Sequence, residues 1–214
     1  MKNILIIAAT EFEFADLDSL ILHKSNHQLQ YLTTGVGMLS TTFRLTKWLL
    51  QNPVDMVFQI GIAGCFNTKI PLGEVVAVDK EFIGDLGVEE NVIWKDMFDV
   101  GFIDTNELPF TNKGIENKNT HTFNLQNIQL ATAITVNEIT TQQHRIKAIQ
   151  QAYAPTLESM EGAALHYVCN SLQIPYLQIR GVSNYVGERD KSKWEIKKAI
   201  EASKQALKQI IDSL

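Results

Sequence analysis

Apolar runs and helical stripes alternate along this chain of 214 residues. Six short stretches rich in Val, Ile, Leu and aromatic residues each end in glycine or polar residues, a pattern typical of buried β-strands. They occupy residues 3–10, 29–37, 54–64, 73–83, 128–136 and 174–184. Between the second and third stretches, residues 40–51 place Leu45, Trp48 and Leu49 on one face of a predicted helix.

Two further segments repeat apolar residues with the period of a helix. The stretch LESMEGAALHYVC, residues 157–169, is predicted to contain the start of a helix, which begins near Met160 and runs to about residue 172. Its apolar face comprises Met160, Ala164, Tyr167, Val168 and Leu172. The last predicted helix lies within residues 193–214, and its stripe comprises Ile196, Ile200, Leu207, Ile210 and Leu214.

Strands that alternate with helices predict an α/β protein. We expect a single-domain three-layer sandwich with a mixed, mostly parallel central sheet. The sequence contains neither an internal repeat nor a linker, so one domain is expected to span residues 1–214. Residues 104–127 are rich in Asn and Thr and weakly periodic, and we expect a loop or a decorated crossover there.

Composition restricts the classes of partner. The chain is 45% hydrophobic, enough for one substantial core, and its formal net charge is −5. It has no run of five or more basic residues, which argues against nucleic acid or an anionic membrane as a partner. The apolar run at residues 4–7 is too short for a signal peptide or a membrane span, so we expect a soluble, cytoplasmic protein.

The two cysteines, Cys65 and Cys169, lie in apolar stretches outside any CxxC motif or Cys/His cluster. Their spacing leaves a disulfide between them open, although nothing in the sequence points to secretion. The sequence therefore implies neither a metal site nor an organic cofactor.

Polar residues end several of the predicted strands, where ligands gather in open α/β sheets. Glu13 follows the first strand, and the glycine-rich turn 61–64 ends the third. Asn137 follows the fifth strand, and the sixth ends at Ser183 and Asn184. Because such strand ends converge on a common rim, the pattern predicts a binding site there.

Each of these features also has an ordinary structural explanation. Glu13 could belong to an acidic first helical turn, and the glycines of the 61–64 turn could serve only the turn. Glu161 could be an acid in the cap region of its helix, and Asn184 could simply close a turn. Arg180 is harder to explain in this way, because a guanidinium inside an apolar strand requires partners.

The order of these features resembles that of the nucleoside phosphorylase and nucleosidase family over nearly the whole chain. A strand with a Glu-rich turn is followed by GVG at 35–37, GIAG at 61–64, SMEGAA at 159–164 and RGVSN at 180–184. The block MEGAALHYVCNSLQIPYLQIRGVSN is the most specific part. QIGIAGCF, AITVNEIT, ESMEGAA and RGVSNYVGERD are most similar to the branch that hydrolyses futalosine in the alternative menaquinone pathway.

The resemblance implies cleavage of an N-glycosidic bond, in which an oxocarbenium-like ribosyl cation develops. By this resemblance Glu13 orients and deprotonates the attacking water, and Glu161 binds the ribose hydroxyls. Met160 packs on the sugar, and Arg180 orients the carboxylates. The other residues expected at the site are Ser183 and Ile139 near the base and, through their backbone, Ile62, Ala63 and Gly64.

Asn184 departs from the adenine-specific nucleosidases of the family, which carry aspartate at this position. Aspartic acid can transfer a proton to N7 of a 6-aminopurine, whereas asparagine can only donate a hydrogen bond. A 6-oxopurine requires less protonation, because O6 can hold negative charge as the base leaves. Asn184, acting with Glu13 and Glu161, therefore favours futalosine as the substrate, cleaved to hypoxanthine and dehypoxanthine futalosine.

Two other departures concern the nucleophile. Phosphorylases of this fold bind phosphate with arginines, and neither the first turn, at residues 9–11, nor the strand before the 61–64 turn contains one. The glutamates near the first turn would repel a phosphate dianion, so water is the expected nucleophile. Adenosine-type hydrolases often read GSAG where this chain reads GIAG, so nucleophile contacts from that serine hydroxyl are not carried over.

Three other functions remain open. Asn184 argues against a methylthioadenosine/S-adenosylhomocysteine nucleosidase, and the missing arginines argue against a purine nucleoside phosphorylase. The pair Glu13 and Glu161 argues against a non-enzymatic nucleoside-binding protein.

The resemblance also implies a homodimer or higher homo-oligomer, in which a neighbouring subunit closes the site. Residues 93–105 are the candidate segment for that role, although their apolar side chains could equally form local core.

Overall fold

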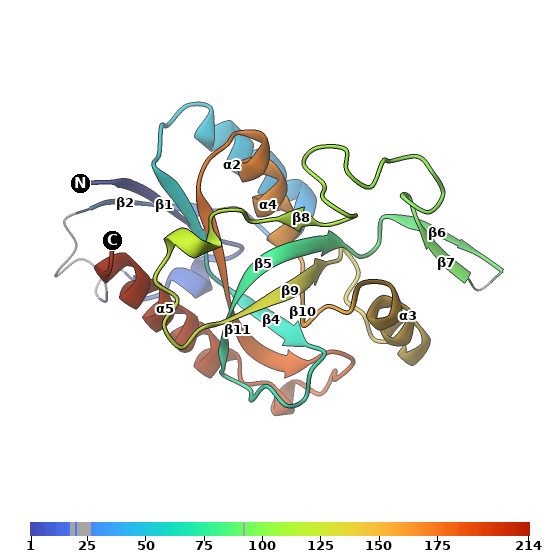
Figure 1. Cartoon of the computed structure of the whole chain (residues 1–214). Coiled ribbons are helices and arrows are strands. Elements are labelled where there is room, and N and C mark those ends of the chain that lie inside the picture. The colour runs from blue at the N-terminus through green and yellow to red at the C-terminus, as the bar shows by residue number, and fades with distance from the viewer. Residues whose placement is uncertain (18–19, 21–26, 92) are drawn as a thin grey trace.

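Strands from both halves of the chain interleave in one mixed sheet (Figure 1), within a computed structural model that describes residues 1–17, 20, 27–91 and 93–214. The helices are α2 (Met38–Leu49), α3 (Gln143–Tyr153), α4 (Gly162–Ser171) and α5 (Ile196–Asp212), with 3-10 turns η1 (Glu11–Phe14), η2 (Thr120–Thr122) and η3 (Lys191–Lys193). The strands are β1 (Asn3–Ala8), β2 (Gln28–Thr33), β3 (Met56–Gln59), β4 (Ile62–Cys65), β5 (Val75–Ile83), β6 (Gly87–Glu90), β7 (Ile93–Asp96), β8 (Ile115–Glu116), β9 (Gln129–Thr135), β10 (Leu157–Ser159) and β11 (Tyr176–Tyr185).

The main sheet has the strand order β2-β1-β3-β11-β4-β10-β9-β5-β8. Most of its pairings are parallel, whereas β10 with β4, β5 with β8 and β11 with β5 are antiparallel. The predicted mixed, mostly parallel sheet is therefore confirmed. The β11–β5 pairing adds a feature that alternation did not predict, because it closes β11, β4, β10, β9 and β5 into a ring.

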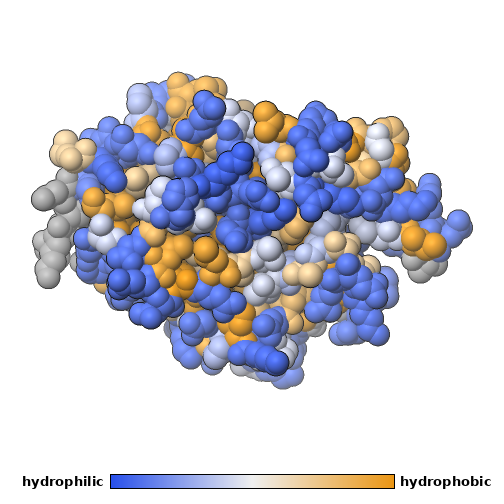
Figure 2. All heavy atoms as spheres, in the orientation of Figure 1, coloured by the Kyte–Doolittle hydropathy of each residue, from blue (hydrophilic) through white to orange (hydrophobic). Residues whose placement is uncertain are grey.

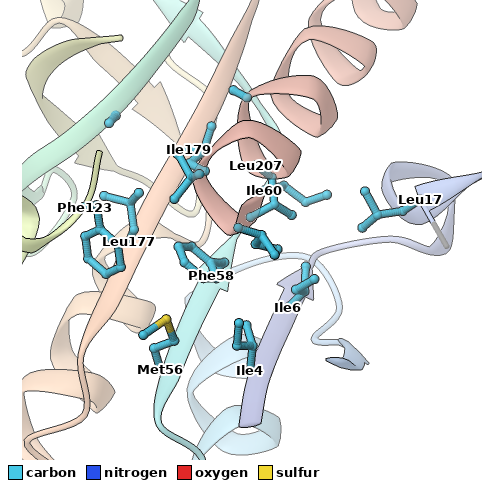
Figure 3. Packing of buried hydrophobic residues seen from close by; sticks show 14 of the residues in the cluster. Ile4, Ile6, Leu17, Met56, Phe58, Ile60, Phe123, Leu177, Ile179 and Leu207 are labelled. Carbon is cyan, nitrogen blue, oxygen red and sulfur yellow. The ribbon is translucent and has the colours of Figure 1, made fainter. Parts of the chain in front are cut away.

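Helices cover the sheet in the predicted layers. On one face, α5 packs against β11 and closes an apolar cluster that includes Ile6, Phe58, Ile179 and Leu207 (Figure 3). On the other face, α2 and α4 pack together over Leu5 and the neighbouring strands. Side chains of a strand alternate between faces, so a continuous apolar run such as β1 supplies both clusters.

Two predicted elements have different bounds in the structure. Residues 157–159 form strand β10, paired with β4 and β9, and the helix begins only at Gly162. The helix therefore begins two residues after the expected start near Met160, and the three strand residues that precede it were not predicted. The predicted strand 54–64 is split into β3 and β4 around Gly61, and β4 pairs with β10 and β11 rather than with β1.

The surface shown in Figure 2 carries many polar side chains, interrupted by apolar groups. Among the described residues, no helix is long and apolar enough to cross a membrane. Cys65 and Cys169 are both buried and free, so the disulfide that their spacing left open is not formed.

Candidate active site

The predicted site residues gather around one cleft of about 280 Å³, at the rim where β1, β4, β10 and β11 end or bend. Those that line it are Glu13, Ile62, Ala63, Gly64, Ile139, Met160, Glu161, Ser183 and Asn184. Arg180 lies behind them, paired with Glu161. A larger groove of about 620 Å³, between the 108–119 segment and the end of α4, contains none of the predicted site residues.

Glu13 is held at the cleft by the turn that follows β1. The backbone N–H and the hydroxyl of Thr10 both donate hydrogen bonds to Glu13 Oε2, at 3.0 and 3.1 Å. Burial raises the pKa of the Glu13 carboxyl, and the positive charge of Arg180 and the Thr10 hydrogen bonds act against that rise. A buried carboxyl with a raised pKa is suited to accept a proton from a bound water.

Arg180 projects from β11 between the two candidate catalytic glutamates. Its Nη2 donates to Gln59 Oε1 at 3.0 Å and lies 3.6 Å from Glu161 Oε2. A Cβ atom added at Gly61 would collide with Arg180 Nη1 and would lie 2.9 Å from Glu13 Oε1. The close approach of these two side chains to the backbone therefore favours glycine at position 61.

Glu161 stands immediately before the first residue of α4, with a backbone outside the helical region. Its Oε1 accepts a hydrogen bond from the backbone N–H of Gly37 at 3.1 Å, and its Oε2 faces Arg180. Gly37 has φ +91°, a conformation that favours glycine. The GVG turn at 35–37 thus holds the Glu161 carboxylate, a role that the sequence pattern did not predict.

Asn184 is oriented by its neighbour on β11. Ser183 Oγ lies 2.8 Å from Asn184 Oδ1, and the amide nitrogen is identified by its contact with the Tyr185 carbonyl, which can only accept. Nδ2 donates one of its two hydrogens to Tyr185 O, at 3.1 Å, and its second hydrogen remains available to a ligand. The amide lies over Gly64, because a Cβ atom added there would be 3.3 Å from Nδ2.

Sequence analysis did not identify two glutamates that lie near the cleft. Glu158 lines the cleft from β10 and is 7% exposed. Glu81, on β5, is fully buried next to Gly162 at the start of α4, where it accepts hydrogen bonds from Gln178 Nε2 at 2.9 Å and Thr135 Oγ1 at 3.0 Å. Burial raises the pKa of Glu81 to about 7. A charged residue inside an apolar strand was the available signal in the case of Glu81.

Apolar side chains complete the walls of the cleft. Phe12, Val36, Val136, Trp194 and Ile200 line it beside the polar residues. Apolar walls with a few converging polar groups suit an aromatic base attached to a sugar. The glutamates outnumber the single guanidinium of Arg180, so the polar part of the cleft favours a ligand on which positive charge develops.

Comparisons with known proteins bear on the family and the fold of this chain. A sequence model of the Phosphorylase superfamily matches residues 3–214. Futalosine hydrolase of Thermus thermophilus is 28% identical over 188 residues, which cover 85% of this chain and 80% of that protein. Aminodeoxyfutalosine nucleosidase of Campylobacter jejuni is 23% identical over 183 residues, 84% of this chain and 78% of that protein. The structure of a futalosine hydrolase mutant of Helicobacter pylori superimposes with a TM-score of 0.83 at 17% identity, covering both chains fully.

Proposed function

The chain belongs to the phosphorylase superfamily and is a purine nucleosidase within it, and we propose that its substrate is futalosine, from which it releases hypoxanthine for menaquinone biosynthesis. The observation that carries the proposal is the convergence of Glu13, Glu161 and the donating amide of Asn184 on one cleft. The likeness to the Thermus thermophilus futalosine hydrolase supports the choice of substrate.

The proposed reaction is a hydrolysis at the anomeric carbon of the ribose. Glu13 takes a proton from a water molecule, and the water oxygen forms a bond to C1′. The bond between C1′ and N9 of the purine breaks, and its electron pair leaves with the base. Glu161 binds the ribose hydroxyls, and its negative charge stabilises the cationic sugar.

Asn184 serves the departing base in this scheme. The free hydrogen of Nδ2 donates to N7 or O6 of hypoxanthine, on which negative charge accumulates as the bond breaks. Because an amide transfers no proton, the base leaves as an anion stabilised by hydrogen bonding and takes its proton from solvent. This division of roles fits a 6-oxopurine better than adenine.

Water rather than phosphate is the proposed nucleophile. Arg180 is the one guanidinium beside the candidate catalytic carboxylates in the described part of the chain, and Gln59 and Glu161 already engage it. A phosphate dianion placed next to Glu13 would face like charge without a free arginine to offset it.

The proposal includes assembly into a homodimer or higher homo-oligomer. Leu39 and Phe43 on α2 and Leu50 directly after it form an exposed apolar face, and contiguous apolar patches can mark protein–protein interaction sites. Val36, at the approach to α2, lines the cleft and is half-exposed, so a second copy covering this face would also narrow the cleft. Residues 93–105, our candidate for closing the site, do not line the cleft of their own chain, so a role in a neighbouring subunit stays a prediction.

The test is to incubate the purified protein with futalosine, inosine and methylthioadenosine, each with and without phosphate, and to follow the released base by chromatography. Hypoxanthine released from futalosine at a rate independent of phosphate is the expected result. A strict requirement for phosphate would identify a phosphorylase, and adenine released from methylthioadenosine with futalosine untouched would overturn the proposed substrate.

A further inference from the structure

The helix that follows Glu161 begins without a capping side chain of its own. Glu161 occupies the N-cap position of α4, but its carboxylate faces the cleft and binds no N–H of the helix. The first N–H groups of a helix then need acceptors from elsewhere. Ser159 Oγ accepts from Gly162 N at 3.3 Å, and Thr135 Oγ1 accepts from Ala163 N at 2.8 Å. The start of α4, and with it Glu161, therefore depends on side chains of β10 and β9.

Glu81 lies directly against this helix start. A Cβ atom added at Gly162 would collide with Glu81 Oε1, so the carboxyl touches the backbone of the first helical residue. Thr135 Oγ1 accepts from Ala163 N, so its own hydrogen is free to be donated to Glu81 Oε2, at 3.0 Å. The other carboxyl oxygen, Oε1, lies 2.9 Å from the amide of Gln178. One carboxyl group thus joins β5, β9 and β11 at the start of α4.

The neighbouring His166 indicates which end of the Gln178 amide faces Glu81. His166 Nδ1 lies 3.0 Å from the carbonyl oxygen of Ile115, which can only accept, so Nδ1 carries a hydrogen. Burial lowers the pKa of His166 to about 4, so the ring is neutral at pH 7 and its Nε2 is an acceptor. The Gln178 amide also faces this ring. With Gln178 Nε2 on Glu81, Gln178 Oε1 and His166 Nε2 are both buried acceptors without a donor among the described residues.

Exchanging the two ends of the Gln178 amide gives each of these atoms a partner. Gln178 Nε2 then donates to His166 Nε2, and Gln178 Oε1 takes the position 2.9 Å from Glu81 Oε1. Two oxygens at this distance need a hydrogen between them, which Glu81 can supply as a protonated carboxylic acid. The ends of a glutamine amide have nearly the same shape, so its hydrogen bonds decide its orientation. Burial favours the same protonated form and raises the pKa of Glu81 to about 7.

The charge of Arg180 connects the proton on Glu81 to the reaction. The charged and titratable side chains that face Glu81 or its partner Gln178 are Arg180 and Tyr176 of β11, Glu161, and His166 of α4. Glu116 of β8 is paired with Lys80 instead. Burial keeps the tyrosine and the histidine neutral at pH 7. A carboxylate at Glu81 would compete with the two candidate catalytic glutamates for the charge of Arg180, whereas a neutral acid leaves that charge to them.

We infer that Glu81 is a positioning residue of the reaction, present as a neutral carboxylic acid that donates its hydrogen to Gln178 and accepts the hydrogen of Thr135. These two bonds fix the start of α4 next to Glu161, and the lack of charge leaves Arg180 to the two candidate catalytic glutamates. The inference rests on the proposed roles of those glutamates in cleaving the nucleoside. Glu81 itself makes no contact with the substrate in this scheme, because its side chain is fully buried.

Infrared spectroscopy tests the protonation state of Glu81 directly. Wild-type protein at pH 6 is expected to show the C=O stretching band of a protonated carboxyl group that the Glu81→Gln variant lacks. Glu107→Gln, at an exposed glutamate, is the matched control and should keep that band. If wild type and Glu81→Gln show the same protonated-carboxyl bands, Glu81 is ionised and the inference is overturned.

The pH profile of base release tests the role of Glu81 in the reaction. Glu81→Gln reproduces the donor and the acceptor of the neutral acid but cannot ionise, whereas Glu81→Leu removes both hydrogen bonds. At pH 6, Glu81→Leu should lower kcat/KM about 10- to 100-fold, and Glu81→Gln should restore most of that loss. Above about pH 7, kcat/KM should fall further in wild type than in Glu81→Gln, because wild type gains a negative charge beside Arg180. If Glu81→Leu does not fold, the comparison of wild type with Glu81→Gln across pH decides.

The outcomes separate this inference from the proposed function, because the pH profile can be measured with whichever nucleoside the protein cleaves. If futalosine is untouched but the infrared band and the pH profile behave as expected with another nucleoside, the inference stands and the proposed substrate falls. If futalosine is cleaved and Glu81→Gln has the spectrum and the pH profile of wild type, the inference falls and the proposed function stands. A band that Glu81→Gln removes without any change in the pH profile would leave Glu81 a purely structural acid and would overturn its role in the reaction.

Discussion

Arg180 Nη2 lies 3.6 Å from Glu161 Oε2, and the two side chains are 2% and 8% exposed. That separation is too long for a hydrogen bond, and the shorter contact of the guanidinium is with Gln59. Arg180 therefore acts on Glu161 mainly through its charge, and Gln59 fixes its direction. The same guanidinium acts against the rise in the pKa of Glu13, so the positive charge of Arg180 stabilises negative charge on both candidate catalytic carboxyl groups.

Replacing Arg180 should cost stability as well as activity. Arg180→Met keeps much of the side-chain volume and removes the charge, which leaves buried carboxylates without compensation. We expect the free energy of unfolding to fall by about 3–5 kcal/mol, the usual cost of breaking a buried ion pair from one side. Urea denaturation at pH 7 measures this effect. Arg44→Met on the exposed face of α2 is the control, and equal losses for the two variants would contradict the assigned role of Arg180.

Glu13→Gln separates catalysis from binding. The amide keeps the size of the side chain but cannot take a proton from water, so hydrolysis should fall about 10²- to 10⁴-fold while hypoxanthine still binds. Base release measured by chromatography and base affinity measured by calorimetry give the two quantities. Glu11→Gln changes the neighbouring exposed acid and should retain activity. Unchanged turnover in Glu13→Gln would remove Glu13 from the mechanism.

Asn184→Asp tests the link between this residue and the leaving group. A carboxylic acid can protonate N7, which favours 6-aminopurine nucleosides, and an ionised aspartate cannot donate a hydrogen bond to O6 of a 6-oxopurine. The ratio of kcat/KM for 6-amino over 6-oxopurine nucleosides should therefore rise. The loss of one hydrogen bond alone corresponds to about tenfold. Competition between futalosine and methylthioadenosine measures that ratio. Asn124→Asp, at an exposed asparagine away from the cleft, provides the control. Higher activity of Asn184→Asp on the 6-oxopurine substrate would show that the argument from Asn184 is wrong.

The strands were predictable wherever burial on both faces produced a continuous apolar run, as in residues 4–8 of β1. Helix α3 was not predicted, because Ile146, Ile149 and Tyr153 are its only buried residues and polar side chains surround them. Strand β10 was missed because three residues carry too little periodicity to separate a strand from the helix that follows. Closure of the sheet by β11 and β5 depends on pairing between distant segments, for which a single sequence has no local signal.

The residues of the candidate site were likewise only partly predictable from the sequence. Glu13, Glu161 and Asn184 could be identified because motif order indicated which strand ends meet. The partners that orient them could not, because the Gly37 N–H that binds Glu161 is 124 positions away along the chain. Glu158 was missed for a related reason, since its partners on β4 and in the 137–142 loop come together only through the sheet register.

Glu81 provides a pH-dependent test of the layer beneath the site. It joins β5 to Gln178 and to Thr135, whose hydroxyl also accepts the N–H of Ala163 in the first turn of α4 at 2.8 Å. The pKa of Glu81 is about 7 in the folded protein against 4.5 for an unperturbed glutamate, because burial disfavours the charge. Below pH 4.5 the carboxyl is protonated in both states and carries no penalty.

As the pH rises from 4.5 to about 7, the unfolded chain loses this proton while the folded chain keeps it, so the contribution of Glu81 to stability falls. Above about pH 7 the loss is complete and amounts to roughly 3 kcal/mol. Glu81→Gln cannot titrate and should remove this dependence. Urea unfolding at pH 5 and pH 8 should therefore show a larger decline for wild type than for the variant, with Glu107→Gln on the surface declining like wild type. If the free energy of unfolding falls equally in all three proteins, Glu81 is ionised at both pH values. The charge of Arg180 would then offset the effect of burial on the pKa of Glu81.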